Sequence, residues 1–121
     1  GRVIVCDREN ERVQLLDARG GFLAAWKGPH LGKPYGIATA PDGHVFLIDG
    51  GSPSVRREQR GKAVELDAAG DVLDTFGSFG KAAGQFQLGH DIAIGPDGSV
   101  YVAEATGARV QKFVRKKPTR N

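Results

Sequence analysis

The chain has 121 residues, of which 40% are hydrophobic and 26% are charged, and it carries a formal net charge of +3. This length suits one small domain, and the balance of apolar and charged residues excludes a disordered polypeptide. The longest apolar stretches, 21–26 and 45–48, are too short to cross a bilayer, so we expect no membrane partner. The single cysteine, Cys6, excludes an internal disulfide and a cysteine-based zinc cluster.

Three apolar runs, each ending in an acidic residue, predict a first set of strands. They cover residues 3–7, 45–49 and 100–104 and end in Asp7, Asp49 and Glu104. Units that contain Pro-Asp-Gly precede the second and third runs, at 35–43 and 90–98. Pro presets φ, Asp caps the turn and Gly adopts a positive φ, so each unit predicts an antiparallel hairpin.

Two further elements repeat along the chain. Arg-Val-Gln begins both 12–16 and 109–113, and Leu-Asp-Ala-x-Gly at 16–20 returns at 66–70 with an apolar run after each glycine. The spacing is consistent, because 55 residues separate both Pro41 from Pro96 and Asp49 from Glu104. The middle repeat holds an insertion within 50–61.

These elements predict a four-stranded antiparallel meander that repeats every 42 to 55 residues, which is typical of a β-propeller. A β-sandwich could use similar strands, but it would not need the same turns in the same order. We expect an all-β fold with an incomplete blade at 1–27, a complete blade at 28–77 and a blade without its outer strand at 78–114. Residues 115–121 form a basic tail.

About two and a half blades are too few for a ring, because propellers close with roughly 4 to 8 blades. Two explanations stay open. Either the sequence is a piece of a longer chain, such as a six-bladed propeller, or copies of it associate as a homo-oligomer to close the ring.

The basic character of the chain comes mainly from its tail. Arg115, Lys116, Lys117 and Arg120 follow Phe113 without an acidic residue, and the rest of the chain has a net charge of −1. We expect a solvated, frayed terminus. A nucleic-acid partner is disfavoured, because the tail has no aromatic residues on which bases could stack.

The repeat resembles the NHL class of propeller. Two segments are more particular: Asp-Arg-Glu-Asn-Glu-Arg-Val-Gln at 7–14 and Gly-Gln-Phe-Gln-Leu-Gly-His-Asp-Ile-Ala at 84–93. Together they resemble peptidyl-α-hydroxyglycine α-amidating lyase, over nearly the whole chain up to Phe113. The resemblance corresponds to the C-terminal half of that family's six-bladed propeller, and the insertion after Asp49 matches a long loop of the family.

The resemblance implies a metal-dependent lyase that cleaves a C-terminal α-hydroxyglycine to a peptide amide and glyoxylate. The family holds zinc with three histidines and calcium with a carboxylate and backbone carbonyls. By resemblance His90 is a zinc ligand, Asp91 is the calcium carboxylate and Arg8 is the catalytic arginine. Neutral imidazole suits zinc, hard oxygen suits calcium and a guanidinium suits a substrate carboxylate.

The sequence also departs from that family. His90 follows Leu88-Gly89 where the family has Met-Pro, and the other two histidines and a tyrosine base would lie upstream of Gly1. Catalytic zinc sites use three protein ligands, so we expect no lyase activity unless other sequence or another subunit supplies the rest. Whether the chain belongs to an enzyme therefore stays open, and the alternative is a non-catalytic NHL propeller that binds a peptide, protein or other ligand on its loop face.

Each candidate residue also has a structural interpretation. His90 could be a hydrogen-bonded channel residue, Asp91 a strand cap and Arg8 a partner of neighbouring glutamates. Tyr35 occupies in the middle repeat the place of His90 in the last, so we expect it to line the channel and contact substrate.

Arg56 and Arg57 give the insertion a basic character. They belong either to a solvated loop or to a lid that binds a substrate carboxylate. The family resemblance would place the protein in a secreted or periplasmic compartment, but the chain shows no signal peptide and leaves its compartment undetermined.

Overall fold

The structure, a computed structural model, describes residues 1–51 and 61–115. Within these ranges the chain forms twelve strands and one turn of 3-10 helix. No helix in the described residues is long and apolar enough to cross a membrane.

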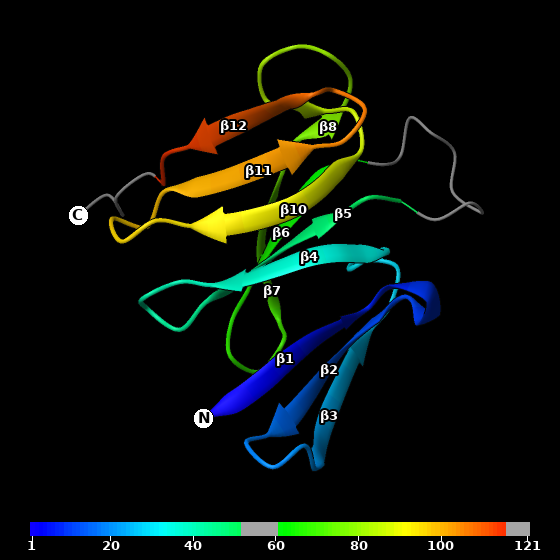
Figure 1. The fold of residues 1–121 in the computed structure, drawn as a ribbon, viewed down its shortest axis with the longest axis vertical. Coiled ribbons are helices and arrows are strands. Elements are labelled where there is room, and N and C mark those ends of the chain that lie inside the picture. Colours follow the sequence, from blue (N-terminus) through cyan, green and yellow to red (C-terminus); the bar gives the residue numbers. More distant parts are fainter. Residues whose placement is uncertain (52–60, 116–121) are drawn as a thin grey trace.

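Three antiparallel sheets follow one another along the chain (Figure 1). The first contains β1 (Arg2–Asp7), β2 (Arg12–Asp17) and β3 (Phe22–Lys27), with the 3-10 turn η1 (Arg8–Asn10) between β1 and β2. The second contains β4 (Pro34–Thr39), β5 (Val45–Asp49), β6 (Lys62–Leu66) and β7 (Val72–Phe76). The third contains β10 (Gly89–Ile94), β11 (Val100–Glu104) and β12 (Arg109–Phe113). These are the strands that the repeats predict.

The connection between the second and third sheets contains a feature that the sequence did not predict. Two short strands, β8 (Ser78–Phe79) and β9 (Gln85–Phe86), form a parallel pair there. Phe86 is fully buried and brings this connection into the apolar core.

Two apolar cores lie between the three sheets. The core between the first and second sheets contains Val13, Leu15, Leu31, Val45, Leu47, Val64 and Leu66. The core between the second and third contains Ala40, Phe46, Ile48, Ala63, Phe86, Ile92, Val100 and Val102. Side chains alternate along β5, so the second sheet is buried on both faces. Such face-to-face stacking of small sheets is the packing of consecutive propeller blades.

The outer faces of the stack keep apolar side chains in solvent. Val3 and Val5 are exposed on β1, while Ile4 between them packs against the first core. At the other side of the stack Val110 of β12 is exposed. Closure of the ring, by further blades or by copies of the chain, stays a prediction.

Candidate functional site

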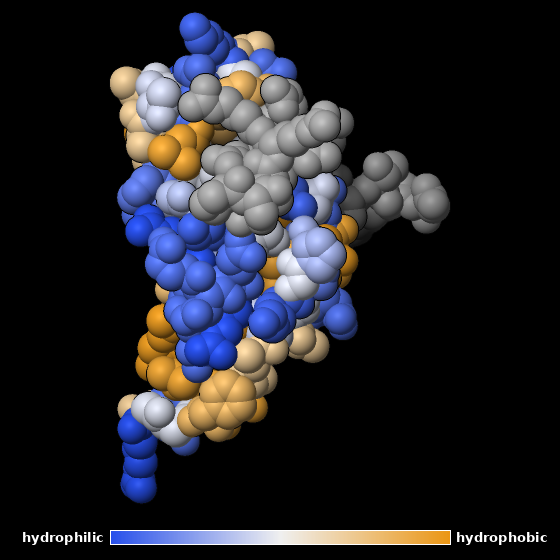
Figure 2. Space-filling view, turned by 90° about the vertical axis from the view of Figure 1, so that its right-hand side faces the viewer, coloured by the Kyte–Doolittle hydropathy of each residue, from blue (hydrophilic) through white to orange (hydrophobic). Residues whose placement is uncertain are grey.

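The three sheets share one end, which we call the η1 end because it carries η1. The strands β1, β5 and β11 finish there, and the inner strands β4 and β10 begin there (Figure 1, right-hand side). Figure 2 looks onto this end and shows hydrophilic side chains over the middle of the face. The opposite end carries the two Pro-Asp-Gly turns, where Gly43 and Gly98 adopt the positive φ angles that the turn requires.

At the η1 end the repeated acids and the repeated Arg-Val-Gln segments are partners. In the first sheet Asp7 Oδ2 accepts hydrogen bonds from Arg12 Nε at 2.7 Å and Gln14 Nε2 at 3.1 Å. In the third sheet Glu104 accepts the equivalent bonds from Arg109 and Gln111. We call each set an acid clamp, and each ties the end of one strand to the start of the next.

The acid clamps also set the charge state of their carboxylates. Hydrogen bonds from Arg12 and then from Asn10 lower the pKa of Asp7. Burial raises the pKa of Glu104, but the hydrogen bonds from Arg109, from the Gln87 backbone and from Gln111 outweigh it, so this pKa is also lowered. Both acids are therefore ionised at neutral pH.

Among the described residues, the second sheet has no acid clamp. Lys62 and Val64 occupy the positions at which the other sheets have arginine and glutamine. Asp49 instead accepts hydrogen bonds from the backbone N–H groups of Lys33, at 2.9 Å, and Gly51, at 2.8 Å. Burial raises the pKa of Asp49 despite these bonds. The carboxylate of Asp49 thus fixes the segment that leads into β4.

Tyr35 and His90 occupy equivalent bulges at the starts of the two inner strands. The register shifts between Pro34 and Gly36 in β4 and between Gly89 and Asp91 in β10. A bulge redirects the side chain of the extra residue. The two rings meet edge to face, with their centroids 5.5 Å apart and their planes at 76°.

Arg8 completes a row of side chains that comes from all three sheets. Its guanidinium carbon lies 4.7 Å from the centroid of the Tyr35 ring, within the range of a cation–π contact. Gly50, which directly follows β5, makes room for the phenol, because a Cβ there would lie 2.4 Å from the Tyr35 ring. Arg8, Tyr35 and His90, singled out from separate motifs, therefore form one contiguous row.

Asp91 lies beside this row. Its Oδ1 accepts the N–H of Ile92 at 2.8 Å, and the carboxylate lies over Gly36, where a Cβ would come within 2.6 Å of Oδ1. Burial, followed by the charge of Asp91, raises the pKa of Cys6 to about 11. The Cys6 thiol stays protonated at neutral pH and is unsuited to act as a nucleophile.

A buried lysine that the sequence analysis missed adjoins the same row. The Lys33 side chain is only 8% exposed, and its Nζ lies 3.4 Å from Glu9 Oε2. Glu9 Oε1 in turn lies 3.2 Å from Arg8 Nε. The position of Lys33, two residues before Tyr35, was the only signal in the sequence.

The chain is similar in sequence to known peptide-amidating enzymes. No family model matches the chain. The chain is 35% identical over 116 residues to peptidyl-glycine alpha-amidating monooxygenase B of Xenopus laevis, which covers 93% of this chain and 13% of that protein. It is 31% identical over 121 residues to peptidyl-alpha-hydroxyglycine alpha-amidating lyase 1 of Drosophila melanogaster, which covers 91% of this chain and 22% of that protein.

Solved structures agree on the fold. A streptogramin B lyase superposes with a TM-score of 0.62 at 15% identity, over 93% of this chain and 37% of that one. The virginiamycin B lyase of Staphylococcus aureus gives 0.61 at 15% identity, over 98% and 39%. The chain has a β-propeller fold of the NHL type, and its sequence is similar to the peptide-amidating enzymes. The predicted resemblance and fold class are thereby confirmed, although the chain spans only 13% and 22% of the two relatives' lengths.

The described residues do not form the zinc and calcium sites that the resemblance implies. Its histidines diverge: His30 folds back over Gly28, His44 pairs with Glu65 at the opposite end, and only His90 lies in the row. Within the described ranges no group of three or more His, Cys, Asp or Glu could hold a metal ion. One imidazole and one carboxylate do not fit a complete zinc or calcium site.

Arg56 and Arg57 lie outside the described residues.

The first residue of the expected basic tail, Arg115, is not solvated as predicted. Arg115 turns back onto the second sheet, where Nη2 lies 2.7 Å from Glu65 Oε2 and Nη1 lies 3.0 Å from Asp42 Oδ2. Tertiary contacts across 50 and 73 positions thus hold a residue that composition alone assigned to solvent.

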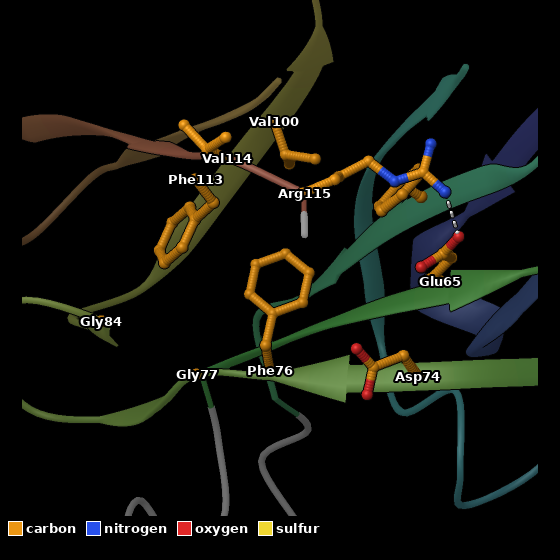
Figure 3. Close-up of a pocket in the computed structure, with 10 residues that line it drawn as sticks. Glu65, Asp74, Phe76, Gly77, Gly84, Val100, Phe113, Val114 and Arg115 are labelled. Atoms are coloured by element: carbon orange, nitrogen blue, oxygen red, sulfur yellow. Dashed lines mark hydrogen bonds and ion pairs between the residues drawn. The ribbon is translucent and has the colours of Figure 1, made fainter. Parts of the chain in front are cut away.

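The same arginine borders a cleft between the second and third sheets (Figure 3). The cleft has a volume of about 610 Å³, and Phe76, Phe113 and Val114 contribute apolar walls. The carboxylate of Asp74 lies on the β7 side, and the ion pair of Arg115 with Glu65 lies on the other. This cleft is separate from the row at the η1 end.

Proposed function

We propose that this propeller segment supplies one part of the active site of a lyase that acts on peptides ending in α-hydroxyglycine. The convergence of Arg8, Tyr35 and His90 from three sheets is the observation that supports it. The name of the Drosophila relative supports the substrate class. The peptide lies at the η1 end, with Arg8 binding its carboxylate and Tyr35 packing beside it.

The proposed reaction is an elimination that needs no added water. The C–N bond of the hydroxyglycine breaks, the C–O bond becomes the carbonyl of glyoxylate, and the hydroxyl proton is transferred to the amide nitrogen. Arg8 suits the binding step, because a guanidinium can bind a carboxylate through two parallel hydrogen bonds. Its position over the Tyr35 ring restricts its rotamers before the substrate arrives.

Zinc and calcium belong to the proposal as cofactors whose remaining ligands lie outside the described residues. His90 would contribute one imidazole to zinc, and Asp91 would contribute one carboxylate to calcium. Neither residue can hold its ion alone.

Glyoxylate release from an α-hydroxyglycine peptide by the full-length protein tests the activity. We expect Arg8→Gln to lower kcat/KM by about 100-fold, because one charge-assisted interaction with the substrate is lost. Arg19→Gln is the matched control, since Arg19 is an exposed arginine in the turn between β2 and β3. Binding of the peptide without glyoxylate release would favour the non-catalytic propeller instead.

Metal content tests the ligands separately. We expect His90→Ala to abolish zinc binding, whereas His30→Ala should leave the zinc content unchanged. Asp91→Asn should lower the calcium content. Equal metal content in the wild type and both site variants would contradict the assigned roles.

A further inference from the structure

The Glu9 carboxylate lies between two cations. Its Oε1 is 3.2 Å from Arg8 Nε, and its Oε2 is 3.4 Å from Lys33 Nζ. The Glu9 side chain is 74% exposed, whereas that of Lys33 is 8% exposed. A solvated acid therefore lies in front of a buried ammonium.

The position of Lys33 is fixed by its backbone. Its N–H donates to Asp49 Oδ1 at 2.9 Å, and its carbonyl accepts the N–H of Gly50 at 3.2 Å. An ammonium group can donate three hydrogen bonds. In the described part of the chain, Glu9 is the one side chain that pairs with this ammonium. A buried cation with a single long contact is poorly compensated, which favours the exchange of Glu9 for an anion that approaches the ammonium more closely.

Arg8 does not depend on Glu9 for its position. Its guanidinium packs over the Tyr35 ring, 4.7 Å from the centroid, and meets Glu9 through Nε alone. If Glu9 rotated into solvent, the guanidinium would keep its aromatic contact. The two cations would then face an empty carboxylate position.

We propose that Arg8 and Lys33 form a carboxylate-binding subsite that Glu9 occupies in the absence of ligand. The C-terminal carboxylate of a peptide displaces Glu9 and takes its place between the guanidinium and the ammonium. The assignment of this carboxylate to the substrate rests on the proposed lyase function. The subsite adds Lys33 as a specificity-determining residue and Glu9 as an internal competitor.

Displacement of Glu9 costs little. The contact of Glu9 with Arg8 is exposed, and its contact with Lys33 is part-buried but long at 3.4 Å. Water solvates the free Glu9 carboxylate well, so little free energy is lost. An incoming carboxylate restores the same two charge contacts. The exchange therefore replaces one counter-ion of Lys33 by another and leaves no buried charge unpaired.

Calorimetric titration of the full-length protein with N-acetylglycine tests the subsite, with the neutral N-acetylglycinamide as the matched probe. We expect the carboxylate to bind more tightly than the amide by about 10-fold. Glu9→Gln should raise the affinity for N-acetylglycine by about fivefold, because the competing charge is removed. Lys33→Met should lower it by about 10-fold, and Lys27→Met, at an exposed lysine that ends β3, should leave it unchanged.

Glu9→Gln decides the result if Lys33→Met fails to fold, since Glu9 is a surface residue. Equal affinity for the two probes, or no gain in Glu9→Gln, would overturn the subsite. Glyoxylate release is scored separately. If Glu9→Gln binds the carboxylate more tightly but no glyoxylate is released, the subsite is supported and the lyase function is refuted. If glyoxylate is released but Glu9→Gln shows no gain in affinity, only the subsite is refuted.

Discussion

Of the two acid clamps, the one in the third sheet should contribute more to the free energy of unfolding. Glu104 accepts hydrogen bonds from the Gln87 backbone, from Arg109 and from Gln111. Arg109 also donates to the carbonyls of Lys81, Ala82 and Gln85, so the network holds the connection that carries β8 and β9. Replacing Glu104 by alanine removes the centre of this network.

The expected cost follows from the burial of each clamp. The Glu104 side chain is 0% exposed and that of Arg109 is 32% exposed, so Glu104→Ala leaves a partly buried cation without its carboxylate and the Gln87 N–H without its acceptor. We expect a loss of about 3 kcal/mol, at the low end for a broken buried pair. In the first sheet Asp7 is 22% exposed and Arg12 is 38% exposed, so Asp7→Ala should cost about 1 kcal/mol.

Urea denaturation measures both values on one scale. The single tryptophan, Trp26, is partly buried against the first core and reports unfolding by its fluorescence. A difference of about 2 kcal/mol between the two variants corresponds to about a 30-fold difference in the unfolding equilibrium constant. If Glu104→Ala cost no more than Asp7→Ala, burial would not be what distinguishes the clamps, and the reasoning would fail.

Three other predictions use the same denaturation assay. Arg115→Ala should lower the free energy of unfolding by about 1 to 2 kcal/mol, because its contacts with Asp42 and Glu65 are lost. An unchanged free energy of unfolding would favour the solvated terminus instead. Gly36→Ala should cost about 1 to 3 kcal/mol, because the new Cβ would lie 2.9 Å from the Asp91 backbone, and an unchanged midpoint would contradict the close approach of β4 and β10. Because the pKa of Asp7 is lowered in the folded protein, its contribution is fully present above the ordinary value of 3.8 and is lost as pH falls through the folded value. Asp7→Asn should therefore flatten the acid side of the stability profile, and an unaltered profile would exclude that contribution.

Much of the architecture could be predicted from the sequence because its turns are chemically specific. Pro-Asp-Gly and the Asp-Ala-x-Gly segments fix hairpins, and the 55-residue offset between the two Pro-Asp-Gly units shows that their hairpins repeat. The same offset relates Tyr35 to His90, which the structure places at equivalent bulges. The short pair of β8 and β9 gave no signal, since two-residue strands are too short to show a period.

The contacts of the site were less accessible to sequence reasoning. The repeated acids and the repeated Arg-Val-Gln segments were both found, but not that Asp7 binds Arg12 and Gln14. Register supplies that information, because the end of β1 faces the start of β2. Lys33 was missed because its meeting with Glu9 depends on how two sheets pack, which no local pattern encodes.

The loss of the acid clamp from the second sheet has a consequence for engineering. In that sheet Asp49 holds the start of β4 through backbone amides, so this anchor does not depend on which side chains begin β6. Beyond Gly50 and Gly51, which contact Tyr35 and Asp49, the chain that leads to β6 can therefore vary in length and sequence while the support of Tyr35 is retained. That makes this junction a natural position for loop grafting, where a new recognition loop can be attached beside an unchanged row of Arg8, Tyr35 and His90.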